Sequence, residues 1–288
     1  MDLSAYGAIT SVVVSRGGEI VAEKYLEGDA ASLRNTRSCT KTVASMLTGI
    51  ASERGLISGV DTPLVQLLGV EVDDPRKGAI TVRDVLTMTS CLDCNDWDDG
   101  SPGNEELMYP QEDWVAFALG LPVRENHGFS YCTAAVASLG VGLERAVGGS
   151  LPDFARRELF EPLGIEQAEW QTTPLGQVST AGGLLLTSRS LLTLGELYQR
   201  GGGGVVPRAW VEESTRPHTR IDEEIEYGYL WWLRRYAGED CFFMTGMGGN
   251  RVHVFPRLEL VAVITSANFG RRDAHALSDR LLEEEILA

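Results

Sequence analysis

The stretch RSCTKTVASMLTGIAS, residues 37–52, has the apolar spacing of a buried helix. Its apolar side chains recur at the i, i+3, i+4, i+7 and i+8 positions of one helix face: Val43, Met46, Leu47, Ile50 and Ala51. Lys41 is the only charged residue between Ser38 and Ser52, and it lies about 60° around the helix axis from Ser38, on the same face. A single ammonium group one turn after a serine, in a segment otherwise suited to burial, therefore needs an explanation.

The helix face that carries Lys41 is otherwise built from small polar side chains. Its other members are Ser38, Ser45, Thr48 and Ser52. Such small side chains let a second layer pack closely, and a lysine trapped between two layers has a lowered pKa because burial disfavours the charged form. A neutral amine one turn from Ser38 can accept the proton of its hydroxyl, which makes the serine a nucleophile. The alternative is that Lys41 reaches solvent from the first helical turn, and an isolated S-x-x-K match does not separate the two.

The composition is that of a globular protein with a strongly acidic charge balance. The 288 residues are 43% hydrophobic and 23% charged, with 25 Lys and Arg against 41 Asp and Glu, for a net charge of −16. The excess of acidic residues is spread along the whole chain and leaves no basic segment. Nucleic acids and anionic membranes bind basic surfaces, so both are disfavoured as partners. No apolar run approaches a membrane span, and no basic segment precedes an apolar run at the N-terminus, so we expect a cytoplasmic protein.

The five cysteines do not form a recognisable metal-binding pattern. Cys91-x-x-Cys94 resembles half of a zinc site, but no second pair of cysteines or histidines accompanies it. We therefore expect no metal and no other cofactor, and the thiols favour a reducing compartment, although an odd count leaves one disulfide open. Cys39 and Cys132 directly follow residues assigned catalytic roles below, so both are expected close to the cleft.

Predicted strands at both ends of the chain enclose a mainly helical middle section. Strands are predicted at residues 10–15 and 19–25, around a Gly17-Gly18 turn, and at 227–233, 241–245, 252–255 and 260–265. Helices are predicted at 38–53, 81–88, 111–119, 132–147, 151–160, 187–200 and 271–287. This order predicts a single α/β (α+β) domain. Its antiparallel sheet comes from both chain ends, about 1–37 and 221–288, around a large helical insertion at about 38–220.

Between these elements runs one long irregular loop, residues 91–110, that is dense in Asp and Glu. A loop of this length in a compact domain is usually functional or disordered. Trp97 and Tyr109 favour packing over disorder. We expect the loop to form a solvated rim that borders the cleft.

Two further stretches extend the Ser-x-x-Lys pattern into a family resemblance. GFSYCTAAVASLG, residues 128–140, places Tyr131 just before an apolar helix. Residues 241–268 order a strand, Thr-Gly, Gly-Gly, a second strand, a turn and a third strand. Together with S-C-T-K, they resemble the serine β-lactamase and penicillin-binding-protein superfamily over nearly the whole chain. The likeness is greatest to class C β-lactamases and the related esterases and 6-aminohexanoate-dimer hydrolases, so it implies a β-lactamase/transpeptidase-like fold.

The resemblance implies a role for each residue of the three motifs. Ser38 is the acylated nucleophile, Lys41 its hydrogen-bonded base, and Tyr131 the residue that passes the proton to the leaving group. The backbone N–H groups of Ser38 and Met247 form the oxyanion hole. Substrate-binding positions fall at Thr133, Met244, Thr245 and Gly246.

The chain departs from the family pattern at two of these positions. Thr133 stands where the family usually has Asn, which removes an amide that orients the substrate carbonyl. Met244 stands where true β-lactamases carry the Lys of Lys-Thr-Gly, so a charge that helps to bind the substrate carboxylate is missing. Since the protein is also strongly acidic, we expect a preference for neutral or amine-bearing esters and amides over β-lactams.

The leading hypothesis is therefore a serine hydrolase of small-molecule esters or amides. An acyltransferase of specialised metabolism, in which an amine intercepts the same Ser38 acyl-enzyme, is the second hypothesis. The third is a non-catalytic ligand sensor with this fold. The four histidines show no link to a serine and no G-x-S-x-G motif occurs, which disfavours a Ser-His-Asp hydrolase.

Overall fold

Two antiparallel sheets organise residues 3–288, the part of the chain that the computed structural model describes. The larger sheet has eight strands in the order β2-β1-β11-β10-β9-β8-β7-β6, and the smaller sheet has the order β3-β5-β4. The larger sheet comprises β1 (Ile9–Arg16), β2 (Glu19–Tyr25), β6 (Thr219–Arg220), β7 (Glu226–Tyr227), β8 (Trp232–Tyr236), β9 (Glu239–Gly246), β10 (Asn250–Phe255) and β11 (Leu260–Ser266). The smaller comprises β3 (Arg34–Asn35), β4 (Ala168–Trp170) and β5 (Leu184–Leu186). Because β1 pairs with β11, the two chain ends build one sheet, as predicted.

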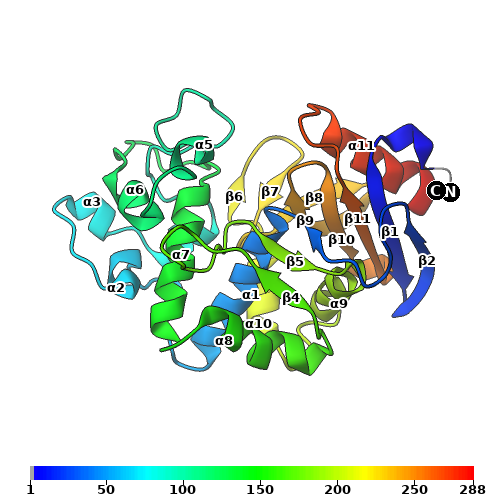
Figure 1. Cartoon of the computed structure of the whole chain (residues 1–288), viewed down its shortest axis with the longest axis horizontal. Helices are drawn as coiled ribbons and strands as arrows, with labels where there is room; N and C mark the ends of the chain where they lie inside the picture. The colour runs from blue at the N-terminus through cyan, green and yellow to red at the C-terminus, as the bar shows by residue number, and fades with distance from the viewer. Residues whose placement is uncertain (1–2) are drawn as a thin grey trace.

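The middle section is helical and lies mainly to one side of the larger sheet (Figure 1). The longer helices are α1 (Cys39–Glu53), α7 (Thr133–Ala146), α9 (Ser188–Gln199) and α11 (Ala274–Leu281). The shorter ones are α2 (Leu64–Leu68), α3 (Pro75–Gly78), α4 (Val82–Leu86), α5 (Glu105–Met108), α6 (Trp114–Gly120), α8 (Leu151–Ala155) and α10 (Arg208–Ser214). Single 3-10 turns are η1 (Ser4–Tyr6), η3 (Glu161–Leu163) and η4 (Pro256–Leu258), and π-helical turns are η2 (Arg156–Phe160) and η5 (Leu282–Ile286).

The larger sheet is covered on both faces, which explains the continuous apolar run of β11. Val261 and Val263 belong to the core beneath α1 and α9. Ala262 and Ile264 belong to a second core beneath α11. Alternate side chains of a strand point to opposite faces, so a strand buried on both faces needs apolar residues throughout.

Helix α1 lies at the centre of the molecule, between the larger sheet and the helical section. It packs against α7 on one side and against β9 and β10 on the other. Every residue from Cys39 to Ala51 is buried, and Lys41 is only 1% exposed. The prediction that this lysine is trapped between two layers is therefore confirmed.

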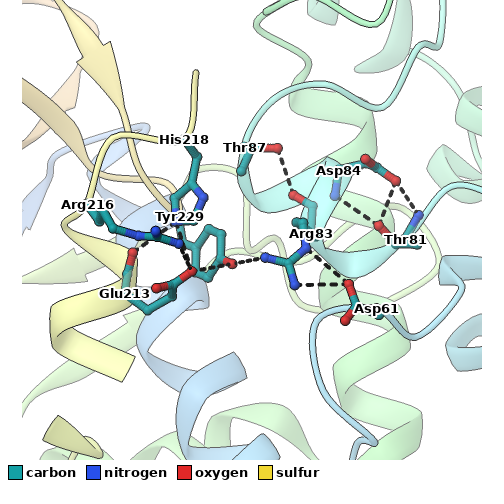
Figure 2. A network of polar contacts seen from close by, with 9 residues as sticks. All are labelled: Asp61, Thr81, Arg83, Asp84, Thr87, Glu213, Arg216, His218 and Tyr229. Atoms are coloured by element: carbon teal, nitrogen blue, oxygen red, sulfur yellow. Dashed lines mark hydrogen bonds and ion pairs between the residues drawn. The ribbon is translucent and has the colours of Figure 1, made fainter. Parts of the chain in front are cut away.

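A polar network around Arg83 and Tyr229 joins the helical section to the larger sheet (Figure 2). Arg83 of α4 donates to Asp61 Oδ1 at 3.0 Å and to Tyr229 Oη at 2.6 Å. The Tyr229 hydroxyl also donates to Glu213 Oε1 of α10 at 3.4 Å, and the ring of His218 stacks on Tyr229 with centroids 4.2 Å apart. These contacts attach α4 to α10 and to the segment between β7 and β8.

One sequence-based expectation needs correction, and one sheet was not predicted. The predicted strand at 227–233 is interrupted, because Leu230 has a positive φ of 59° and its N–H donates to Leu86 of the helical section instead of to a strand. The three-stranded sheet was not expected, since its strands are only two or three residues long. Among the described helices, none is long and apolar enough to cross a membrane.

Candidate active site

Ser38 and Lys41 form a hydrogen-bonded pair at the N-terminus of α1. Lys41 Nζ donates to Ser38 Oγ at 2.9 Å and to the carbonyl oxygen of Ala181 at 2.6 Å. Ser38 is the N-cap residue, with helical dihedrals and no side-chain cap hydrogen bond. Its hydroxyl is therefore available to a substrate, and its N–H lies at the positive end of the helix dipole.

The surroundings of Lys41 act on its pKa in two directions. Burial lowers the pKa because the ammonium form loses its hydration, and this is the largest effect. The nearby carboxylates of Glu105 and Asp96 and the thiol of Cys39 raise it, but the net change is downward. A buried lysine with a lowered pKa can act as a base toward the hydroxyl that it contacts.

Tyr131 lies beside this pair. Its ring centroid is 5.0 Å from Lys41 Nζ, and the ring stacks on Trp97 at 5.6 Å. Burial raises the pKa of Tyr131 well above its usual range, and the hydrogen bond with Ser38 acts in the opposite direction. The phenol is therefore protonated at neutral pH and can donate a proton or a hydrogen bond. The structure brings together the three residues that the sequence assigned to catalysis.

Gly246 brings the end of β9 against the first residues of the Ser38 segment. A Cβ atom at this position would overlap the carbonyl oxygen of Thr36 and would lie 3.1 Å from the backbone nitrogen of Ser38. This close approach needs glycine and places the segment that begins with Met247 next to Ser38. The arrangement is compatible with an oxyanion hole formed by the N–H groups of Ser38 and Met247.

Two cavities meet at Ser38. One, of about 490 Å³, we call the aromatic cavity, because its walls include Trp97, Tyr131, Trp232, Tyr236 and Phe243; charged residues complete its lining. The other, of about 400 Å³, is more polar, and its walls include Arg37, Glu106, Thr133, Gln171 and Ser179. Ser38, Glu105 and Met247 line both cavities. The serine can therefore be reached from two directions.

The geometry of this site agrees with the comparisons to known proteins. The family model described as beta-lactamase matches residues 7–285. The chain belongs to the beta-lactamase family. No curated protein matches the sequence. The predicted likeness to the serine β-lactamase and penicillin-binding-protein superfamily is thus confirmed.

Solved structures show the same fold at low sequence identity. A penicillin-binding protein from Bacillus halodurans is 17% identical, with a TM-score of 0.78, over 97% of this chain and 98% of that chain. A D-stereospecific amidohydrolase from Streptomyces sp. is 16% identical, with a TM-score of 0.74, over 98% and 96%. A hydrolase with promiscuous acyltransferase activity is 14% identical, with a TM-score of 0.74, over 94% and 93%.

The predicted substrate-binding residues of this family member do not all reach the cavities. Thr133, Thr245 and Gly246 line them, but Met244 does not. Met244 is fully buried in the core on the α1 side of the sheet, so its side chain offers no surface to a substrate. The expectation that its apolar side chain sets the preference for substrate charge therefore loses its structural basis.

A cation that sequence reasoning missed lies on the neighbouring strand. Arg251 of β10 is paired in register with Thr245, is only 6% exposed and lines the aromatic cavity. Its Nε forms an ion pair with Asp279 Oδ1 at 3.3 Å. The Oγ1 atom of Thr245 is buried and makes no hydrogen bond within residues 3–288. The position of Arg251 beside Thr245 follows from the register of β9 and β10, and no sequence motif predicts that register.

The acidic loop does more than form a rim. Its residue Asp96 is half-buried and accepts hydrogen bonds from the N–H groups of Thr133 at 2.8 Å and Glu105 at 2.9 Å. The N–H of Asp96 donates to the carbonyl oxygen of Tyr131 at 2.9 Å. Burial raises the pKa of Asp96, while the charge of Lys41 lowers it. Two carboxylates of the loop thus lie inside the site.

A disulfide joins this loop to the segment that carries Tyr131. Cys94 and Cys132 are bonded, whereas Cys39, Cys91 and Cys241 are free and buried. Cys39 and Cys132 were expected close to the cleft, but neither lines the two cavities at Ser38. Burial raises the thiol pKa of Cys39 to about 12, so this thiol stays protonated at neutral pH. The sequence had left one disulfide open, and this bond is the one that the structure contains.

Proposed function

We propose that the protein is a serine hydrolase that cleaves ester or amide bonds through an acyl-enzyme at Ser38. The observation that carries the proposal is the 2.9 Å hydrogen bond between Ser38 Oγ and Lys41 Nζ, with the lysine buried. A binding domain has no need of a desolvated lysine beside an accessible hydroxyl. The complete Ser38, Lys41 and Tyr131 set therefore speaks against the non-catalytic sensor.

The proposed reaction has two stages. Lys41 accepts the hydroxyl proton while Ser38 Oγ attacks the substrate carbonyl, and the N–H groups of Ser38 and Met247 stabilise the oxyanion. Tyr131 donates its proton to the leaving alcohol or amine and regains one from Lys41, so the acyl-enzyme forms with the base neutral again. Water then attacks the ester carbonyl and gives its proton back to Ser38 through the same groups.

Transfer of the acyl group to an amine is the second candidate function. The polar cavity that meets Ser38 is lined by Glu105 and Glu106, and carboxylates concentrate amines near a site. An amine bound there would compete with water for the acyl-enzyme. The structurally similar hydrolase with promiscuous acyltransferase activity supports the idea that this fold accommodates both outcomes.

The nucleophile is tested by covalent labelling. We expect a fluorophosphonate to add one phosphonyl group per protein, detected by intact-protein mass and mapped to Ser38 by peptide sequencing. The Ser38→Ala variant should carry no adduct and show no turnover of an activated ester. A folded wild-type protein that never acylates with a broad panel of probes would instead favour the sensor hypothesis.

Substrate charge is tested by comparing acyl donors. We expect nitrocefin, which is anionic, to be cleaved with a lower kcat/KM than a neutral p-nitrophenyl ester or an amine-bearing amide. Asp96 and Glu105 line the same cavity as Ser38. The two arginines of that cavity, Arg234 and Arg251, both form ion pairs with Asp279. Nitrocefin turnover well above both other substrates would contradict this part of the proposal.

A further inference from the structure

Thr133, which stands where the family pattern has Asn, is in contact with a carboxylate from the acidic loop. Thr133 Oγ1 donates to Glu105 Oε2 at 3.1 Å, across 28 residues of sequence. The Tyr109 hydroxyl donates to the same oxygen at 2.7 Å. Glu105 is half-buried and lines both cavities that meet at Ser38. The threonine that replaces the expected asparagine is thus paired with an anion from the loop.

Backbone hydrogen bonds and a disulfide also hold Glu105 in this position. Its backbone N–H donates to Asp96 Oδ1, and the other carboxylate oxygen of Asp96 accepts from the N–H of Thr133. The disulfide between Cys94 and Cys132 fastens the same two segments covalently. Three links therefore join the loop to residues 131–133: the hydrogen bond from Thr133 N–H to Asp96, the hydrogen bond from Thr133 Oγ1 to Glu105, and the disulfide. They hold Glu105 in a fixed position relative to Tyr131 and Thr133.

The charge of Glu105 acts on the catalytic base. The titratable groups that act on Lys41 are Glu105 of α5, Asp96 of the loop and Cys39 of α1, and Glu105 has the largest influence of the three. Burial disfavours the ammonium form of Lys41, while a nearby carboxylate favours it. When Lys41 takes the Ser38 proton it becomes an ammonium. A carboxylate held in the cavities that meet at Ser38 stabilises this state, in which the serine attacks.

We propose that Glu105 is a positioning residue of the Ser38–Lys41 pair, whose fixed negative charge sets the pH at which the pair becomes active. This inference rests on the proposed function, since it assumes that Lys41 is the base. Without the charge, Lys41 would lose its proton at a lower pH but would also be a weaker base. Removing the charge therefore has two opposite effects on the pH profile.

The test is the pH dependence of kcat/KM for a neutral p-nitrophenyl ester, from about pH 5 to about pH 9. In the Glu105→Gln variant we expect the midpoint of the acidic limb to move to lower pH by about one unit. The plateau at high pH should fall by about tenfold, since a weaker base transfers the proton more slowly. A purely structural role would lower the plateau and leave the midpoint in place.

Two further variants separate the charge from its contacts. Glu112→Gln removes the same charge from an exposed position that lines neither cavity at Ser38, so its profile should coincide with that of the wild type. Thr133→Val removes the hydrogen bond to Glu105 but leaves the carboxylate in the disulfide-fastened loop. We expect this variant to lose plateau activity with a midpoint that moves much less than in Glu105→Gln.

Three results would overturn the inference. They are an unmoved midpoint in Glu105→Gln, an equal shift in Glu112→Gln, and an equal shift in Thr133→Val. Fluorophosphonate labelling separates these from a failure of the proposed function. If wild type and Glu105→Gln both label at Ser38 but their midpoints coincide, the hydrolase stands and only the role of Glu105 is wrong. If wild type neither labels nor turns over, the hydrolase itself is wrong.

Discussion

Replacing Lys41 by methionine should lower kcat/KM for an activated ester by about 10²–10⁴-fold, the usual contribution of a positioned general base. The methionine side chain has a similar length and suits a buried site, so it removes the amine without leaving a cavity. Lys41 is 1% exposed and its Nζ contacts both Ser38 and Ala181, so no solvent-borne base can take its place. Steady-state kinetics near pH 8 measure the loss.

The same substitution should raise thermal stability at neutral pH. Burial lowers the pKa of Lys41 in the folded protein below that of the unfolded chain, so the unfolded state binds more protons between the two pKa values. Wild-type stability therefore rises with pH through this window, and below it the protein bears the cost of a buried ammonium. The stabilisation of Lys41→Met over wild type should be largest at low pH and shrink toward about pH 10, the unfolded lysine pKa.

Melting curves of wild type and Lys41→Met across pH test whether Lys41 is a buried base with a lowered pKa. Lower activity with higher stability is typical of a residue whose burial serves catalysis. A variant that keeps wild-type activity would show that another group deprotonates Ser38. A variant that is inactive and also less stable at every pH would mean that Lys41 stabilises the fold. The predicted cost of burying its ammonium group would then be wrong.

The contact between Ser38 and Lys41 could be predicted because both residues belong to one short local motif. Ser38 and Lys41 share one helix turn, and the apolar stripe of that helix predicts its burial before any tertiary contact is known. Tyr131 and Met247 were found by resemblance, since their sequences alone carry no chemical signal. The antiparallel sheet from both chain ends and the helical insertion were likewise predictable, because the strand patterns lie at the two ends of the chain and the helical patterns lie between them.

The charges around the site could not be predicted because they depend on register and on the path of a loop. Met244 and Thr245 are neighbours in sequence, but alternation along β9 sends one into the core and leaves the other at the cavity. Arg251 reaches the same cavity only because β10 pairs with β9 in one particular register. Glu105 lies inside the site only because a disulfide and Asp96 fold the loop inward. Composition could only predict that the loop is acidic.

Replacing Gly246 by alanine should lower kcat by about 10²–10³-fold, the usual cost of losing one oxyanion-hole donor. Gly246 has no positive φ, so the effect does not come from backbone strain. It is steric, because a Cβ atom would overlap the carbonyl oxygen of Thr36. The end of β9 must then move away from Ser38, and the N–H of Met247 moves with it.

Gly120→Ala is the matched control for this substitution. A Cβ atom there meets nothing within 4 Å, and its φ is also not positive, so activity and melting temperature should stay near those of wild type. In Gly246→Ala, fluorophosphonate labelling of Ser38 should slow in parallel with turnover, since both reactions need the oxyanion hole. KM should change less than kcat, because the lost interaction forms only in the transition state. A folded Gly246→Ala variant with wild-type kcat would show that the oxyanion is stabilised elsewhere, and the role assigned to Met247 would be wrong.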